Sequence, residues 1–263
     1  MIKLIAADMD GTLLNENELV PEEFFEVFEE LDRRGIKFTA ASGRQKANQY
    51  KMLNPIVDRI GIIFENGSCG EFMGESFYKT EIDEYIVNSV IDIARKDKLN
   101  LVISTEDMAY LEGNNEEFNN TVIRFYENVS IIDDLKEIKE PVISMTIAKL
   151  DGTISALYES FQEKYKNDLS MTTSMNLWLH MLNKDADKGK AIKKLQEKLN
   201  ISEEETMVFG DGLNDLELLK SAKYSFAMDN ASDYVKNHAN YVAPSNKENG
   251  VVKIIKQYIL DKK

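Results

Sequence analysis

The stretch that decides the fold is KLIAADMDGT, residues 3–12, in which a short apolar run ends in two carboxylates two positions apart. Lys3 to Ala7 has the pattern of a buried parallel strand whose carboxyl end carries polar side chains. Gly11 lets the backbone turn away behind Asp8 and Asp10. Such a pair can offer one carboxylate as nucleophile and metal ligand while the other transfers protons. The alternative is a solvated turn, because Asp-x-Asp-Gly is also common in loops and calcium sites.

Strands and helices alternate after this stretch. A helix with one apolar stripe is predicted between Pro21 and Gly35, and apolar runs at 36–41 and 60–64 predict two further strands. This β-α-β-α-β order favours a parallel sheet covered on both faces, with ligands bound beyond the carboxyl ends of the strands. Ser42 follows the second strand and is expected at the same edge as Asp8.

The middle of the chain has a different pattern. Several strands with helices on one side indicate a separate α+β unit of about a hundred residues, an ordinary domain size. The predicted helices are 82–96, 116–126 and 154–165, and the predicted strands are 101–104, 108–111, 142–148 and 176–182. From Asp187 the earlier alternation returns, with helices at 191–199 and 251–260 and strands at 206–209 and 224–227. We therefore predict an α/β fold: a Rossmann-like parallel-sheet core, residues 1–82 and 184–263, interrupted by an inserted α+β domain, residues 83–183.

Composition restricts the partners. The chain has 263 residues, 43% of them hydrophobic, and a formal charge of -14, which disfavours nucleic acid or an anionic membrane as a main partner. A phosphorylated small molecule remains compatible with this charge if a metal and basic side chains gather in one cleft. Cys69 is the single cysteine, which excludes an internal disulfide and fits a reducing compartment. We expect a cytoplasmic protein without a signal peptide or membrane span, either a monomer or a small homo-oligomer.

A second acidic loop follows the strand at 206–209. Its sequence GDGLND, residues 210–215, separates Asp211 from Asp215 by one helical turn if a helix begins there. Carboxylate oxygens are ligands that Mg²⁺ prefers, and the alternative is a helix cap, with which metal binding is compatible. The Ser42 hydroxyl and Lys188 could hold a phosphate, although a serine before glycine is usually a turn and a lone lysine is usually exposed.

Together these segments resemble the haloacid dehalogenase superfamily, in particular the Cof-type phosphatases with a large α/β (type IIB) cap between the second and third motifs. The four motifs are matched by residues 8–14, 41–44, 188–189 and 210–215, and further likeness lies at 66–67, 227–231 and 249–251. Two departures are mild. Ser42 stands where threonine is commoner, and Asp229 stands where glycine is usual.

The resemblance implies a function and a role for each matched residue. Asp8 would attack phosphorus, and Asp10 would protonate the leaving group and then activate water. Mg²⁺ would be held by Asp8, the Asp10 backbone carbonyl and Asp211, with Asp215 in support. The remaining phosphoryl oxygens would be held by Lys188, Ser42, the Gly43 N–H and Asn214. The expected substrate is a small phosphorylated metabolite such as a sugar phosphate. A phosphomutase that uses the same intermediate, or a regulator that binds phosphate ligands without turnover, are the alternatives.

Recognition of the leaving group is assigned to the cap. In the strand predicted at 176–182, Asn176, Trp178 and His180 fall on one side, and Leu177, Leu179 and Met181 fall on the other. An amide, an indole and an imidazole suit a hydroxylated or ring-shaped ligand. The structural alternative is that Trp178 fills the cap core and His180 is solvated.

Overall fold

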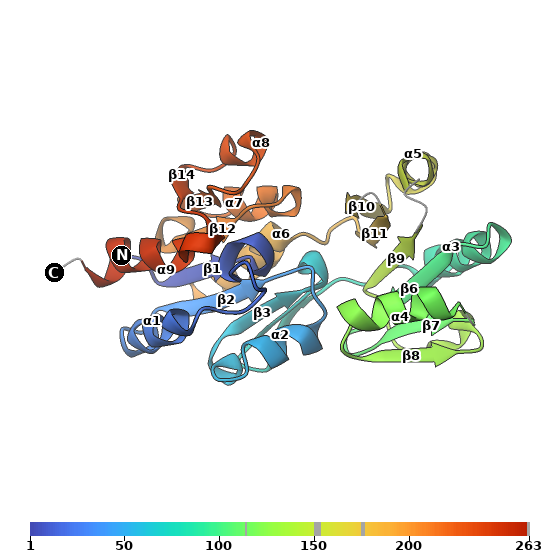
Figure 1. Cartoon of the computed structure of the whole chain (residues 1–263), viewed down its shortest axis with the longest axis horizontal. Helices are drawn as coiled ribbons and strands as arrows, with labels where there is room; N and C mark the ends of the chain where they lie inside the picture. Colours follow the sequence, from blue (N-terminus) through green and yellow to red (C-terminus); the bar gives the residue numbers. More distant parts are fainter. Residues whose placement is uncertain (114, 150–153, 175–176, 262–263) are drawn as a thin grey trace. The chain divides into compact units, whose positions relative to one another are not determined.

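The computed structural model describes residues 1–113, 115–149, 154–174 and 177–261, which divide into two compact units (Figure 1). The first unit comprises residues 1–43, 49–78 and 187–263, and the second comprises 44–48 and 79–186. The second unit thus extends a few residues beyond the expected 83–183 on both sides. It also includes residues 44–48, which the sequence pattern had placed with the core.

The first unit is built on a mostly parallel sheet with the strand order β14-β13-β12-β1-β2-β3-β4-β5. Its strands are β1 Leu4–Ala7, β2 Lys37–Ala41, β3 Gly61–Phe64, β4 Cys69–Phe72, β5 Glu75–Lys79, β12 Thr206–Gly210, β13 Tyr224–Met228 and β14 Tyr241–Ala243. Pairing is parallel from β14 to β3, and β4 then runs antiparallel to β3. The α/β fold class is confirmed. Ala7 pairs with both Phe209 and Ala40, so the carboxyl ends of β1, β12 and β2 lie at one edge.

Helices cover both faces of this sheet. They are α1 Glu22–Arg33, α2 Lys46–Met52, α6 Lys188–Leu199, α7 Leu216–Lys220, α8 Asp233–Lys236 and α9 Gly250–Ile255. Ile192 of α6 and Leu218 of α7 pack with Ala6 on one face. On the other, the ring of Phe24 in α1 lies 4.9 Å from that of Phe38 in β2. Burial on both faces explains why β1, β3 and β12 read as nearly continuous apolar runs.

The second unit is an α+β unit with the strand order β10-β11-β9-β6-β7-β8. Its elements are α3 Glu84–Lys96, β6 Asn100–Ser104, β7 Ala109–Glu112, α4 Glu116–Phe125, β8 Val129–Ile132, β9 Ser144–Ala148, α5 Ile154–Tyr165, β10 Leu169–Ser174 and β11 Trp178–Asn183. Pairing is antiparallel except between β7 and β8. Helices α3 and α5 pack on the face that carries Leu179, whereas α4 packs on the face that carries Trp178. The expectation that all helices lie on one side was therefore wrong.

Within the described ranges, no helix combines the length and the apolar character that crossing a membrane requires.

Candidate active site

Asp8 stands at the carboxyl end of β1, where the sheet fixes its backbone. Its N–H donates to the Phe209 carbonyl of β12 at 3.0 Å, and its side chain is buried. The chain then turns through Gly11, whose φ is +74°; a side chain there would collide with the carboxylate of Asp211. Glycine therefore lets the first loop pack directly against the acidic loop behind β12. Asp10, between these residues, is exposed.

Asp215 is a fully buried carboxylate whose two oxygens have different partners. Oδ2 accepts the backbone N–H groups of Asp211 and Gly212, both at 2.9 Å, so it caps the turn behind β12. Oδ1 accepts a bond from Lys188 at 2.8 Å. This side chain therefore holds the shape of the acidic loop and also fixes the lysine.

Lys188 begins α6 and is completely buried, unlike an ordinary surface lysine. Its Nζ donates to Asp8 Oδ1 at 2.7 Å as well as to Asp215. Asp187 caps the helix by accepting the N–H of Lys190 at 2.7 Å, which fixes where the helix starts. The ammonium group thus joins the end of β1 to the acidic loop behind β12 through two charge-assisted hydrogen bonds.

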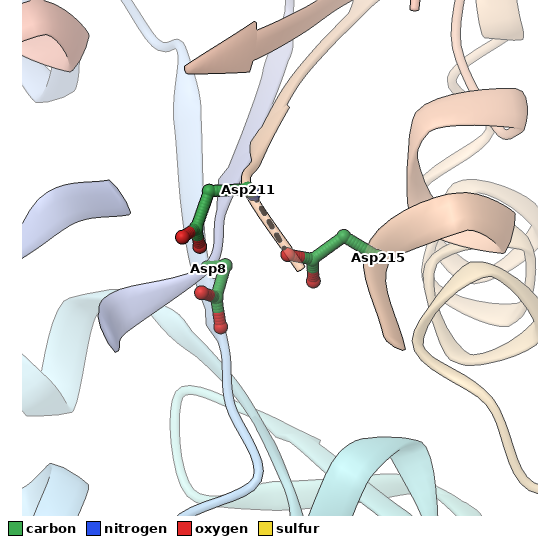
Figure 2. Close-up of side chains that lie close together, drawn as sticks. All are labelled: Asp8, Asp211 and Asp215. Atoms are coloured by element: carbon green, nitrogen blue, oxygen red, sulfur yellow. Dashed lines mark hydrogen bonds between the residues drawn. The ribbon is translucent and has the colours of Figure 1, made fainter. Parts of the chain in front are cut away.

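Three carboxylates converge here, and Figure 2 shows their side chains. Ligand oxygens of Asp8, Asp211 and Asp215 all lie within 4.8 Å of one another. Burial, followed by the charge of Asp215, raises the pKa of Asp8 well above its usual value. The same two causes raise the pKa of Asp211 to about 6. Burial lowers the pKa of Lys188, but Asp215 and Asp8 outweigh it and hold that pKa above its ordinary value.

This charge balance fits a cation. Three buried or half-buried carboxylates face a single ammonium group, so ionising all of them is costly without further positive charge. The donors are oxygen atoms only, which suits a hard divalent ion such as Mg²⁺ rather than a soft one. Asp8 and Asp211 can supply ligands, because Asp8 binds Lys188 through Oδ1 and each oxygen of Asp211 accepts one bond from a neutral side chain. Asp215 instead accepts three bonds, one of them from the Lys188 ammonium. The exposed side chain of Asp10 lies outside this group of three.

The loop behind β2 carries the expected phosphate-binding groups. Ser42 is buried, and its N–H donates to Ile63 at 2.9 Å. A Cβ on Gly43 would lie 2.9 Å from the amide of Asn66, so a larger residue here would displace that side chain. The Nδ2 of Asn214 donates to Asn66 Oδ1 at 2.9 Å. All of these residues and Lys188 belong to the first unit.

Two polar residues that hold Asp211 were given no role from the sequence. Thr12 Oγ1 donates to Asp211 Oδ1 at 3.1 Å, and Asn230 Nδ2 lies 3.3 Å from Oδ2. Asn230 also donates to the Gly11 carbonyl at 2.8 Å and so joins the two acidic loops. The likeness at 227–231 was a signal for Asn230, but its partners depend on the folded sheet. Asp229, the departure beside it, pairs with Lys236 at 3.0 Å.

The expected recognition residues lie in the second unit, apart from Asn176, which falls outside the described residues. Trp178 is buried and packs with Val102 and the α4 residue Phe118. His180 Nδ1 lies 3.2 Å from Thr146 Oγ1, and burial lowers the pKa of His180 to about 4. These contacts agree with the alternation expected along the strand and give Trp178 a core-filling position.

Comparison with known proteins agrees with this arrangement. A family model described as haloacid dehalogenase-like hydrolase matches residues 5–255. The 5-amino-6-(5-phospho-D-ribitylamino)uracil phosphatase YbjI of Escherichia coli (strain K12) is 26% identical over 97% of this chain and 95% of its own length. The structure of SMU.1108c from Streptococcus mutans UA159 is 28% identical in sequence and has a TM-score of 0.89. The match covers 99% of this chain and 100% of that one. A structure described as the HAD subclass IIB sugar phosphatase BT4131 is 27% identical, with a TM-score of 0.82, over 97% of this chain and 98% of that one.

The chain belongs to the haloacid dehalogenase-like hydrolase family. Within that family its relatives are named as phosphatases, and phosphatase is the enzyme class of this chain.

Proposed function

We propose that the protein is a Mg²⁺-dependent phosphatase of small phosphorylated metabolites, sugar phosphates among them, which acts through a phosphorylated Asp8. The observation that carries this proposal is the buried Lys188, which binds Asp8 and Asp215 at 2.7 and 2.8 Å beside Asp211. A lysine in a purely structural ion pair needs one carboxylate, whereas this one stands among three. Such a group suits the binding of a cation and a phosphoryl dianion together.

The proposed chemistry has two halves. Lys188 holds Asp8 Oδ1, which orients the carboxylate so that its other oxygen attacks phosphorus and the ester P–O bond breaks. Asp10 gives its proton to the departing alkoxide. It then takes a proton from water as the water attacks phosphorus, which releases phosphate and restores the Asp8 carboxylate. The exposure of Asp10 suits a group that must meet both the leaving group and water.

The remaining residues bind and orient the phosphoryl group. The Ser42 hydroxyl, the Gly43 N–H, the Asn214 amide and the Lys188 ammonium supply donors around it. Asp8, Asp211 and the backbone carbonyl of Asp10 would hold Mg²⁺. When bound, the ion supplies positive charge that offsets repulsion between the Asp8 carboxylate and the phosphate dianion.

The substrate is proposed from relatives of moderate similarity. YbjI is named for a ribitylaminouracil phosphate, and BT4131 is described as a sugar phosphatase. Both descriptions name a phosphate on a hydroxylated carbon chain or ring. We therefore place the substrate of this chain in the same chemical class.

A phosphate-release assay tests the proposal. Purified protein would be incubated with sugar phosphates, sugar-alcohol phosphates, nucleotides, flavin mononucleotide and pyridoxal phosphate, with Mg²⁺ or with excess chelator. We expect free phosphate as the dominant product, only with Mg²⁺, and the highest kcat/KM on a sugar or sugar-alcohol phosphate. Undiminished release in chelator would contradict the metal assignment, and transfer of phosphate to a second sugar would favour a phosphomutase.

A further inference from the structure

The turn between β3 and β4 has an unusual backbone. Glu65, Asn66 and Gly67 follow one another with φ values of +47°, +53° and +95°. This left-handed region is unfavourable for a residue such as glutamate, easier for asparagine and free for glycine. Three such residues in succession persist only where the surrounding structure fixes them. The turn is therefore a defined structural feature and not a variable loop.

The backbone of this turn contacts two of the loops that carry the active site. The N–H of Asn66 donates to the Ser42 carbonyl at 3.0 Å, which joins the turn to the loop behind β2. A Cβ on Gly67 would lie 2.5 Å from the backbone nitrogen of Lys188, so the turn also packs directly against the start of α6. Asn66 is thereby held in place through main-chain contacts on both sides.

The side chain of Asn66 then reaches a third loop. Its Oδ1 accepts a hydrogen bond of 2.9 Å from the Nδ2 of Asn214. A primary amide carries two N–H groups on one nitrogen and a carbonyl oxygen on the other side. With the Asn66 oxygen as the acceptor, the Asn214 amide lies with its nitrogen facing Asn66. One N–H is used in the bond, and the second is left for another acceptor.

The geometry points to Asn66 as a positioning residue that orients the Asn214 amide so that it presents an N–H, and not its carbonyl oxygen, to the phosphoryl group. This inference rests on the proposed role of Asn214 in binding a phosphoryl oxygen. The reversed amide would place a carbonyl dipole against phosphate oxygens, which is repulsive. In this role Asn66 acts through Asn214 and needs no contact of its own with the reacting atoms.

Asn66→Gly tests the inference. Glycine adopts a φ of +53° without strain and keeps the backbone bond to Ser42, so only the side chain is removed. We expect kcat/KM for p-nitrophenyl phosphate to fall about ten-fold, the kinetic equivalent of one hydrogen bond. The matched control is Asn200→Gly, because Asn200 has the same φ of +53° but ends α6, at the opposite end of that helix from Lys188. The control should retain wild-type kcat/KM.

A double-mutant cycle separates positioning from a general structural role. Asn214→Ala should lower kcat/KM at least as much as Asn66→Gly, and the double variant should be no worse than Asn214→Ala, because Asn66 acts through Asn214. Asn66→Ala, which also removes the acceptor, should behave like Asn66→Gly. Wild-type activity of Asn66→Gly, or effects that multiply in the double variant, would overturn the inference and leave the proposed function intact. Wild-type activity of Asn214→Ala would instead remove the phosphate-binding role on which the inference rests.

Discussion

Asp8, Asp211 and Asp215 carry the same side chain, but their hydrogen-bond partners differ. Asp215 binds two backbone N–H groups and Lys188, so it is fully used within the protein. Asp8 shares one oxygen with the same lysine. Asp211 accepts from Thr12 and Asn230 and is only half-buried. These contacts are compatible with the proposed roles: support for Asp215, nucleophilic attack for Asp8 and metal binding for Asp211.

Asp8→Asn should abolish turnover while preserving the fold. The amide is a poor nucleophile, but it is nearly isosteric and keeps an oxygen that can accept from Lys188. We expect kcat to fall by at least about 10³-fold, with an unchanged circular dichroism spectrum. Asp58→Asn makes the same exchange at an exposed position and should retain full activity. A variant at Asp8 that kept a substantial fraction of wild-type kcat would exclude the covalent mechanism.

Asp211→Asn should stabilise the metal-free protein at neutral pH. The pKa of Asp211 is about 6 instead of 3.8, so its ionised form is disfavoured in the folded state. The wild type therefore loses stability as pH rises from about 4 to about 6, and the variant does not lose this contribution. In chelator at pH 7.5 we expect the free energy of unfolding of the variant to exceed that of the wild type by about 1 to 2 kcal/mol. This is less than the whole pKa shift would give, because Asp211 is partly exposed and the variant loses the bond to Asn230.

Urea unfolding at several pH values measures this difference. The gap between the variant and the wild type should close near pH 4, where Asp211 is protonated. Added Mg²⁺ should stabilise the wild type more than the variant, because the ion binds the ionised carboxylate. A gap that is independent of pH would show that the titration of Asp211 is not its cause.

At the scale of elements, two glycines with similar backbones have different surroundings. Gly67 follows β3 with a φ of +95°, and an added Cβ would lie against the backbone of Asp187 and Lys188. Gly74, in the turn between β4 and β5, has a φ of +77° with nothing within 4 Å of an added Cβ. The positive φ disfavours any other residue at both positions, whereas of the two only Gly67 packs closely against another backbone segment.

Gly67→Ala should therefore be much more damaging than Gly74→Ala. Backbone strain alone should cost about 1 kcal/mol in each variant. At Gly67 the collision with the start of α6 should add more than about 2 kcal/mol and shift Lys188, so kcat/KM should fall as well. Urea denaturation and phosphate release measure both effects. Equal losses of stability in the two variants would mean that packing against α6 does not constrain the turn.

Much of the fold was predictable because core strands have strong local signals. Apolar runs such as Leu4–Ala7 and Thr206–Gly210 are buried on both faces, and the acidic loops directly follow them. Two of the strands that the sequence analysis missed have weaker signals. Leu169–Ser174 is largely polar and lies at the edge of its sheet, and Tyr241–Ala243 has only three residues. The sequence of an edge strand or a short strand does not identify it as a strand unless its neighbour in the sheet is known.

The clustering of the acidic residues was predictable for a related reason, and their supporting contacts were not. Asp8 and Asp211 each end an apolar strand, so parallel pairing brings them to one edge. Thr12 and Asn230, which donate to Asp211, lie 199 and 19 positions from it in the sequence. Such bonds depend on loop geometry that no local pattern specifies. The burial of Lys188 likewise follows from its two partners and not from its own sequence context.

At the scale of the whole molecule, the chain connects the two units next to residues of the proposed site. The chain leaves the first unit after Gly43, and residues 44–48 are grouped with the second unit. The chain leaves the first unit again after Tyr78 and returns at Asp187, immediately before Lys188. Gly43, a proposed phosphate-binding residue, is therefore covalently adjacent to the inserted unit, and Lys188, another, lies one residue beyond it. In the proposed function these residues would contact only the phosphoryl group, so we expect selectivity for the rest of the substrate to come from the inserted unit.

Trp178 and His180 should respond differently to substitution if the inserted unit provides selectivity. Trp178 is 6% exposed and packs against α4, so Trp178→Ala should cost about 3 to 5 kcal/mol of stability and lower activity uniformly across substrates. His180 is neutral at physiological pH because burial lowers its pKa to about 4, and its ring can give or accept a hydrogen bond. His180→Ala should therefore change the ratio of kcat/KM between a sugar phosphate and p-nitrophenyl phosphate by about ten-fold, the value of one hydrogen bond to substrate. The chain supplies its own control in His238, the other histidine, which contacts Tyr234 in the first unit. His238→Ala should leave that ratio unchanged, and a ratio equally unaffected by His180→Ala would limit His180 to its contact with Thr146.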